Sequence, residues 1–262
     1  VGRRLSNHFV EPIHQLSDGV REISMGALDK KLDIRTGDEI ESLAIAFNAM
    51  TDRLQSYIEN LTRATADREH IETELSIAEN IQQAMLPREF DFGRTEFELF
   101  ATMHAAKEVG GDFYDFFFVD INKLALVIAD VSGKGIPASL FMMRSKTAIR
   151  TVAEEGFPPT EIFNRVNATL CDGNDADMFV TVWIGIIDLE TGVMHCANAG
   201  HEYPAILRAG GEYELLKDKH SLALAVMPGI PMKEYELQLN PGDRLYVYTD
   251  GVPEAINEQT EQ

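Results

Sequence analysis

Three aspartates are the residues of this chain best suited to chemistry: Asp112 in GGDFYD, Asp130 in DVSGKG and Asp250 in YTDGVPEA. Each follows or lies near an apolar, strand-like run, and each has glycine within one to three residues. A carboxylate at a strand end, with glycine beside it, can approach a cation closely, and hard divalent cations prefer oxygen ligands. The three motifs therefore predict one oxygen-rich site for divalent metal ions.

Each aspartate also has an ordinary structural interpretation. Asp130 ends an apolar run and precedes Pro137, so it could be a turn residue or the cap of a following helix. Asp250 precedes a glycine and could belong to a turn. Asp112, between two glycines and an aromatic run, is a weak signal when taken alone. The position of all three at strand ends favours the metal site.

Composition limits the possible functions. The chain has 262 residues, 45% of them hydrophobic and 25% charged, as in an ordinary soluble globular protein. Its formal net charge of -20 argues against nucleic acid as a partner, because phosphates favour basic surfaces. Cys171 and Cys196 have no metal-binding spacing and indicate a reducing compartment. No run approaches the ~20 apolar residues of a membrane span.

The first 86 residues carry two helical patterns. In the first, apolar residues at alternating spacings of four and three form one stripe along a helix: Phe9, Ile13, Leu16, Val20 and Ile23. Gly26 ends this pattern, and residues 27–37 are predicted to form an extended connector. Asp38 and Glu39 then open a second helix, where acidic residues suit the helix dipole.

The second helix is predicted to continue to Pro87 as a coiled coil. An apolar heptad seam runs from Ile40 to Met85 without a glycine or proline, which is too long for a lone globular helix. A partner chain is expected to cover this seam. Arg68 and Gln82 interrupt it, either because the register is imperfect or because the coil has a weak point that lets it switch.

The chain after Pro87 has a different pattern, of strands with a pair of helices between them. The predicted helices are Pro137–Glu155 and Thr160–Leu170. The predicted strands are Phe97–Met103, Tyr114–Val119, Lys123–Val131, Phe179–Asp188, Val193–Asn198, Tyr203–Arg208, Tyr235–Leu239 and Arg244–Thr249. This grouping indicates the α+β class with antiparallel sheets.

Seven segments, taken together, resemble one protein family. They are AENIQQAMLP (78–87), VGGDFYD (109–115), DVSGKGIPA (130–138), FVT (179–181), NAGH (198–201), PGD (241–243) and YTDGVPEA (248–255). In type and order they resemble the sporulation-phosphatase (SpoIIE-like) branch of the PPM metal-dependent protein phosphatases. The front segment resembles a HAMP signalling module, with Pro12 early in its first helix and GDEI (37–40) opening its second.

The resemblance implies a fold and a set of site residues. The fold would be an αββα sandwich with two Mn²⁺ or Mg²⁺ ions between its sheets. Asp130 would bridge the ions, and the backbone carbonyl of Val131 would ligate one of them. Asp112 would support one ion, directly or through water, and Asp250 would bind the other. Two metals can activate a bridging water and hold the phosphoryl oxygens for in-line attack, which makes these aspartates the catalytic residues.

Other positions carry smaller expectations. His201 is expected to organise a turn rather than bind metal, and Lys134 to be a solvated loop residue rather than a phosphate contact. Leu224-Ala225-Val226 stands where the family usually has Leu-Gly-Val, which could tighten a turn near the site. The family also has a last strand with an Asp-Asp motif that completes the metal site. No counterpart precedes Gln262, so we expect a C-terminally truncated sandwich.

These expectations combine into a domain plan. It consists of a HAMP module (1–56), a coiled-coil linker helix (57–86) and a PPM-type phosphatase domain (87–262). The resemblance implies a serine/threonine phosphatase acting on phosphoserine of a STAS-type anti-sigma-factor antagonist, and a homodimer formed through HAMP and a parallel coiled coil. The Arg3-Arg4 pair suggests a preceding transmembrane helix, so the parent protein would lie at the cytoplasmic face of the membrane and this chain would be soluble.

Two other functions remain open at this stage. The chain could belong to a dimeric signalling scaffold with an incomplete, inactive phosphatase domain. It could also belong to another two-metal enzyme, such as a nucleotide cyclase downstream of a HAMP module. Metal-dependent release of phosphate would favour the phosphatase, whereas turnover of nucleotide would favour the cyclase.

Overall fold

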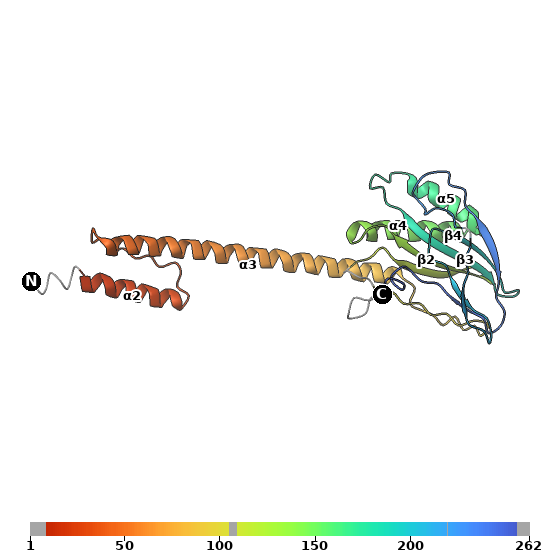
Figure 1. Cartoon of the computed structure of the whole chain (residues 1–262), viewed down its shortest axis with the longest axis horizontal. Helices are drawn as coiled ribbons and strands as arrows, with labels where there is room; N and C mark the ends of the chain where they lie inside the picture. The colour runs from red at the N-terminus through yellow and green to blue at the C-terminus, as the bar shows by residue number, and fades with distance from the viewer. Residues whose placement is uncertain (1–8, 105–108, 219, 256–262) are drawn as a thin grey trace, which may run out of the picture. The chain divides into compact units, whose positions relative to one another are not determined.

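The computed structural model describes residues 9–104, 109–218 and 220–255, and it divides the chain into two compact units, Val1–Glu74 and Leu75–Gln262. Helix α3 (Glu39–Met85) runs through the boundary between them. Figure 1 shows the helices and strands of each unit. Among the described residues, no helix combines the length and apolar character needed to cross a membrane.

The first unit contains helix α2 (Glu11–Ser24), a connector and most of α3. Pro12 lies in the first turn of α2, where its missing N–H has no helical partner to lose. The connector is irregular, as predicted. It is fixed on α3 by the Asn48 amide, whose Oδ1 accepts from the Leu32 N–H at 2.9 Å and whose Nδ2 donates to the Leu32 carbonyl at 2.9 Å.

Helix α3 begins where the sequence predicts it. Asp38 Oδ1 accepts a hydrogen bond from the Ile40 N–H at 3.0 Å, and Glu41 accepts one from the Gly37 N–H at 2.7 Å. Seam residues farther along the helix are exposed in the single chain, among them Leu54 at 41% and Leu61 at 50%. Pairing of this seam in a coiled coil stays a prediction.

The second unit is α+β, and all its strand pairs are antiparallel, as predicted. A five-stranded sheet has the order β1-β2-β3-β4-β7, and a three-stranded sheet has the order β6-β5-β8. The strands are β1 (Phe113–Asp120), β2 (Lys123–Val131), β3 (Val180–Asp188), β4 (Val193–Ala199), β5 (Ala205–Leu207), β6 (Tyr213–Leu215), β7 (Glu234–Gln238) and β8 (Arg244–Tyr246).

Two apolar cores define the layers. Helices α4 (Ile136–Ala153) and α5 (Pro159–Cys171) cover one face of the five-stranded sheet (Figure 1). The core under them contains Val182 and Ile184 of β3, whereas Trp183, between these two, packs with Ile206 of the other sheet. This alternation follows from strand geometry, in which successive side chains point to opposite faces. The described residues thus form three successive layers of an αββα sandwich: helix, sheet, sheet.

One strand prediction is wrong, and one strand was not predicted. Residues 97–103 form no strand; Phe100 is 79% exposed, and Phe97 contacts Phe92 with ring centroids 6.0 Å apart. An alternating pattern makes a strand only where a neighbouring strand offers hydrogen bonds. Strand β6 was not predicted, because its three residues are too few for a period-two pattern to be told from a loop.

Ala225 has an unfavourable backbone conformation, with φ of 68°. This is the position where the family usually has glycine, and an L-residue in the left-handed region costs about 1–2 kcal/mol. Asn167 of α5 holds the turn: its Oδ1 accepts from the Ala225 N–H at 2.8 Å, and its Nδ2 donates to the Met227 carbonyl at 3.0 Å. The departure from glycine therefore produces local strain.

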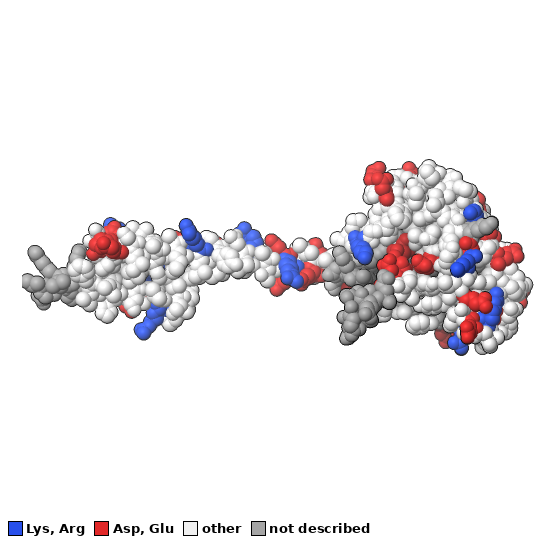
Figure 2. Space-filling model, in the orientation of Figure 1, with Lys and Arg blue, Asp and Glu red and all other residues white. Residues whose placement is uncertain are grey.

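The excess of acidic residues is not confined to one place. On the face of the second unit drawn in Figure 2, acidic side chains are scattered between basic and uncharged ones. A surface of this kind favours solubility without pointing to one partner.

Candidate functional site

Strand pairing brings Asp112 and Asp130 together. In the register between β1 and β2, Phe113 pairs with Ala129, so Asp112 and Asp130 are the next residues along the two strands. Their carboxyl groups are close enough for a hydrogen bond, which requires a proton on one of them. Both residues are partly buried, whereas Asp250, in the turn after β8, is exposed.

The carboxyl group of Asp130 has strongly perturbed electrostatics. Burial, followed by the hydrogen bond and charge of Asp112 and the charge of Asp250, raises the pKa of Asp130 to about 8, and Lys134 acts in the opposite direction. Asp250 is therefore close enough to influence the other two aspartates. Carboxylates held together in this way need a proton or a cation between them.

Gly111 allows the backbone carbonyl of Val131 to lie close to the segment that carries Asp112. A Cβ atom on Gly111 would lie 2.6 Å from the Val131 carbonyl oxygen and 3.0 Å from its Cβ. Those distances are too short for any residue with a side chain. The glycine of the GGD motif thus permits close contact between the segment carrying Asp112 and the end of β2.

Thr249 connects the Asp250 turn to Asp112. Its hydroxyl donates a hydrogen bond to Asp112 Oδ2 at 2.7 Å. The turn itself is closed by the Glu254 N–H, which donates to the Asp250 carbonyl at 2.9 Å. Sequence reasoning missed this role of Thr249, although the residue lies inside the YTDG motif and directly precedes Asp250.

Thr181 and His201 support Asp130 from the neighbouring strand. Thr181 pairs with Asp130 across β2 and β3, and its hydroxyl donates to the Asp130 carbonyl at 3.3 Å. The same hydroxyl lies 2.9 Å from His201 Nδ1. The turn itself is held by Asn198, whose Oδ1 accepts from the His201 backbone N–H at 2.8 Å and whose Nδ2 donates to the His201 carbonyl at 3.2 Å. Burial lowers the pKa of His201 to about 4, and the ring is therefore neutral at pH 7.

The loop after Asp130 is fixed by short contacts and by backbone conformation. The Ser132 N–H donates to the Phe179 carbonyl at 2.9 Å, and the Phe179 N–H donates to Ser132 Oγ at 3.0 Å. Gly133 and Gly135 have φ of 88° and 80°, a region that favours glycine. Lys134 lies between them and is exposed.

The structure explains why the polar residue Gln82 interrupts the apolar seam, which the sequence alone did not. Its side chain is buried in the second unit, where Nε2 donates to the Gly110 carbonyl at 2.6 Å and Oε1 accepts from the Gly110 N–H at 3.2 Å. The break in the apolar seam at this position is therefore a specific contact with the GGD segment.

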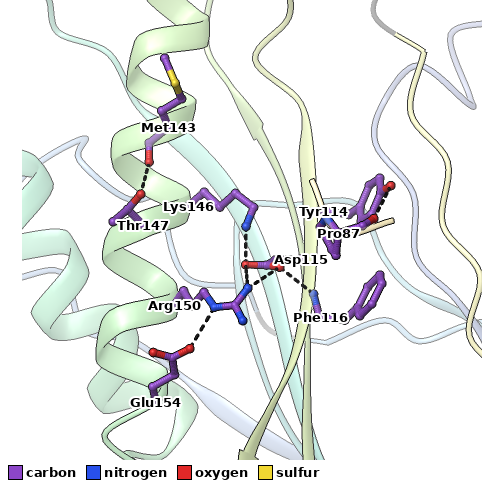
Figure 3. A network of polar contacts seen from close by, with 9 residues as sticks. All are labelled: Pro87, Tyr114, Asp115, Phe116, Met143, Lys146, Thr147, Arg150 and Glu154. Carbon is purple, nitrogen blue, oxygen red and sulfur yellow. Dashed lines mark hydrogen bonds and ion pairs between the residues drawn. The ribbon is translucent and has the colours of Figure 1, made fainter. Parts of the chain in front are cut away.

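A second acidic residue of the GGDFYD motif serves a different purpose (Figure 3). Asp115 of β1 is buried against α4, where its Oδ2 lies 2.6 Å from Lys146 Nζ and its Oδ1 lies 3.3 Å from Arg150 Nη1. Tyr114, the preceding residue, points to the other side of the strand, and its hydroxyl donates to the Pro87 carbonyl at 3.1 Å. Sequence reasoning assigned no role to Asp115.

The oxygen atoms at the candidate site suit a hard divalent cation. Two carboxylates are in contact, a third acts on them electrostatically, and a backbone carbonyl lies against the same segment. As placed in the described parts of the chain, no three Asp, Glu, His or Cys side chains converge closely enough to form a ready metal cluster. The Asp112–Asp130 pair is thus the centre to which an ion would draw Asp250.

Comparison with known families finds two matching regions in this chain. The model for Stage II sporulation protein E (SpoIIE) matches residues 120–262, and the model for the HAMP domain matches residues 4–56. The chain belongs to the SpoIIE family. The expected resemblance is confirmed.

Two curated relatives illustrate the extent of the similarity. Protein IcfG of Synechocystis sp. is 29% identical over 95% of this chain and 43% of its own length. Phosphoserine phosphatase RsbU of Bacillus subtilis is 30% identical over 84% of this chain and 65% of its own length. The chain thus spans about half to two thirds of the relatives it matches.

Solved structures show the same fold. The SiaA-PP2C domain of Pseudomonas aeruginosa aligns with a TM-score of 0.63 at 24% identity, over 74% of this chain and 78% of that one. The phosphatase domain of SpoIIE from Bacillus subtilis, with a fragment of its regulatory domain, aligns with a TM-score of 0.52 at 23% identity, over 58% and 44%. The predicted sandwich is therefore confirmed as the fold.

Proposed function

We propose that this SpoIIE-family chain carries the catalytic part of a metal-dependent protein serine/threonine phosphatase. Its substrate would be phosphoserine on a STAS-type anti-sigma-factor antagonist, and its HAMP module and α3 would transmit a signal to the site. The name of RsbU, a phosphoserine phosphatase, supports the choice of substrate group.

One observation carries the proposal: the contact between Asp112 and Asp130. Two carboxylates in contact, with a third nearby and a raised pKa on Asp130, form an anionic centre that lacks a compensating partner of equal charge. Such a centre binds divalent cations. Phosphate esters are hydrolysed extremely slowly without catalysis, and bound divalent ions supply an activated water and positive charge for the phosphoryl oxygens.

The side chains have distinct roles in this proposal. Asp112, Asp130 and Asp250, with the carbonyl of Val131, would hold two Mn²⁺ or Mg²⁺ ions. Thr249 keeps the Asp112 carboxylate oriented through its 2.7 Å hydrogen bond. Lys134 is exposed in the loop after Asp130, as expected of a solvated lysine, and its charge lowers the pKa of Asp130.

The proposed setting is a signalling protein at a membrane. A HAMP module and an exposed apolar seam on α3 support a homodimer formed through HAMP and a parallel coiled coil. The parent protein would then lie at the cytoplasmic face of the membrane, with a transmembrane helix ahead of the HAMP module.

The test is release of phosphate from a phosphoserine-containing STAS-domain protein, measured with Mn²⁺ and with EDTA. We expect Mn²⁺-dependent release by the wild-type chain and a loss of at least about 100-fold in Asp130→Asn, because removing a charge at the metal centre removes the activated water. Asp120→Asn, at the exposed end of β1, is the matched control and should retain activity.

Two results would contradict the proposal. Equal release by wild type and Asp130→Asn would exclude the aspartate centre as the catalytic site. Tight binding of the STAS-domain protein without any release would favour the dimeric scaffold with an inactive domain.

A further inference from the structure

Gln82 is a buried polar residue in the last turn of α3. Its exposure is 1%, although neighbouring residues on the same helix, such as Ile81 at 56%, are exposed. A buried amide has to find hydrogen-bond partners within the protein. Gln82 finds both of them on Gly110, by donating to its carbonyl at 2.6 Å and accepting from its N–H at 3.2 Å.

The segment that Gln82 contacts has a backbone with high intrinsic conformational freedom. Gly110 and Gly111 precede β1, outside the regular hydrogen bonding of the sheet, and glycine has the largest backbone freedom of any residue. Asp112 follows directly. Unless something fixes the two glycines, the Asp112 carboxylate can move relative to Asp130.

Two contacts fix the two glycines. Gly111 lies against the Val131 carbonyl, at a distance that excludes any side chain. Gln82 occupies both polar backbone atoms of Gly110. The amide therefore completes a clamp on the segment that carries Asp112.

We propose that Gln82 is a positioning residue for Asp112 and that its amide is the point where α3 acts on the candidate site. The contact depends on which face α3 turns toward Gly110. A rotation of the last helical turn would withdraw the amide and break both hydrogen bonds together. The inference rests on the proposed function only in taking Asp112 and Asp130 as a metal centre.

Other contacts near the end of α3 provide a comparison. The Tyr114 hydroxyl donates to the Pro87 carbonyl at 3.1 Å, and Leu86 packs in the core. These contacts fix the chain just after α3 on β1, but they do not touch Gly110. Gln83, next to Gln82, is exposed and bonds to Glu79 on the same helix at 3.0 Å.

The experiment compares Gln82→Met with Gln83→Met and Tyr114→Phe in the full 262-residue chain. Methionine has a similar length but cannot form the two hydrogen bonds. Two quantities are measured: Mn²⁺ affinity by calorimetry, and hydrogen–deuterium exchange of residues 109–113 without metal. Circular dichroism confirms that each variant is folded. Gln82→Glu, which keeps the acceptor and loses the donor, covers the case in which Gln82→Met does not fold.

We expect Gln82→Met to weaken Mn²⁺ binding by about 10- to 100-fold, as for other residues that orient metal ligands. Exchange of residues 109–113 should become faster in the same variant. Gln82→Glu should be affected at least as strongly, because its carboxylate would place an oxygen against the Gly110 carbonyl. Both controls should bind Mn²⁺ as the wild type does.

Wild-type affinity in a folded Gln82→Met variant would overturn the inference, as would an equal loss of affinity in Tyr114→Phe. Absence of Mn²⁺ binding by the wild-type chain would also overturn it. If the wild type binds Mn²⁺ but releases no phosphate, the proposed function fails. The Mn²⁺ affinities of the wild type and of Gln82→Met still decide the role of Gln82 in that case.

Discussion

Two aspartates of the GGDFYD motif have opposite electrostatic surroundings. Asp115 is buried, with an exposed side-chain fraction of 2%, and is paired with Lys146 and Arg150. Asp112 instead faces the carboxyl group of Asp130, with Asp250 nearby. The protein supplies the cations for Asp115, whereas it supplies a second anion for Asp112.

This difference in charged partners distinguishes Asp115, a structural aspartate, from Asp112, a candidate metal ligand. A buried carboxylate with two cationic partners has its charge balanced within the fold and needs no cation from solution. A pair of carboxylates in contact raises the pKa of one member, and only a proton or a cation from solution can relieve it. Charge balance thus identifies the site within a motif that contains both kinds of aspartate.

The largest effect expected from this comparison is on the Asp115 network. Lys146→Met should lower the free energy of unfolding by about 3–5 kcal/mol, because it leaves the buried Asp115 carboxylate with only the partly exposed Arg150. Urea denaturation without metal measures the change.

Lys123→Met is the matched control, since Lys123 lies 3.8 Å from Asp120 in an exposed pair. Its effect should stay within about 0.5 kcal/mol. A loss of stability as small in Lys146→Met would mean that the Asp115 network is not the balanced structural cluster described above.

A second prediction concerns His201, which lies beside the candidate site without adding positive charge. Its pKa, lowered to about 4 by burial, means that below pH 6.5 the unfolded chain takes up a proton that the folded chain does not. The stabilisation is therefore present above about pH 6.5 and is lost as the pH falls toward 4, by up to about 3 kcal/mol. Unfolding free energies measured across this range test the slope.

The free energy of unfolding of the wild type relative to that of His201→Asn should fall as the pH drops from 6.5 to 4, because asparagine can bond to Thr181 without titrating. Taking this difference removes the opposite contribution of Asp130, whose raised pKa favours the folded chain over the same range. His70→Asn is the control: His70 is exposed on α3, with a side-chain exposure of 74%, so the slope should be that of the wild type. An unchanged slope in His201→Asn would show that His201 is not a buried neutral group.

Much of the fold could be predicted from the sequence, because its elements have strong local patterns. The apolar run of β2 and the periodicity of α3 predict their ends to within one or two residues. The wrong prediction at residues 97–103 and the unpredicted strand β6 have one cause. Whether a short segment becomes a strand depends on a partner that is distant in sequence, and local alternation carries no information about it.

The candidate site could be predicted in part. Asp112, Asp130 and Asp250 were found because carboxylates beside glycine leave a local pattern. Gln82, Asp115, Thr181 and Thr249 were assigned no such role. Their partners lie between 28 and 137 residues away in the chain, so only the folded structure brings each contact together.

The central claim is that the Asp112–Asp130 pair takes its missing positive charge from divalent metal ions. The most direct measurement is the free energy of unfolding at neutral pH, with and without Mn²⁺, for the wild type, Asp112→Asn and Asp130→Asn. Mn²⁺ at about 100 times its dissociation constant should stabilise the wild type by about 2.7 kcal/mol. Neither variant should gain this stability, and without metal neither should be less stable than the wild type. An equal Mn²⁺ effect in all three proteins, or destabilisation of the metal-free variants as large as that in Lys146→Met, would contradict the account.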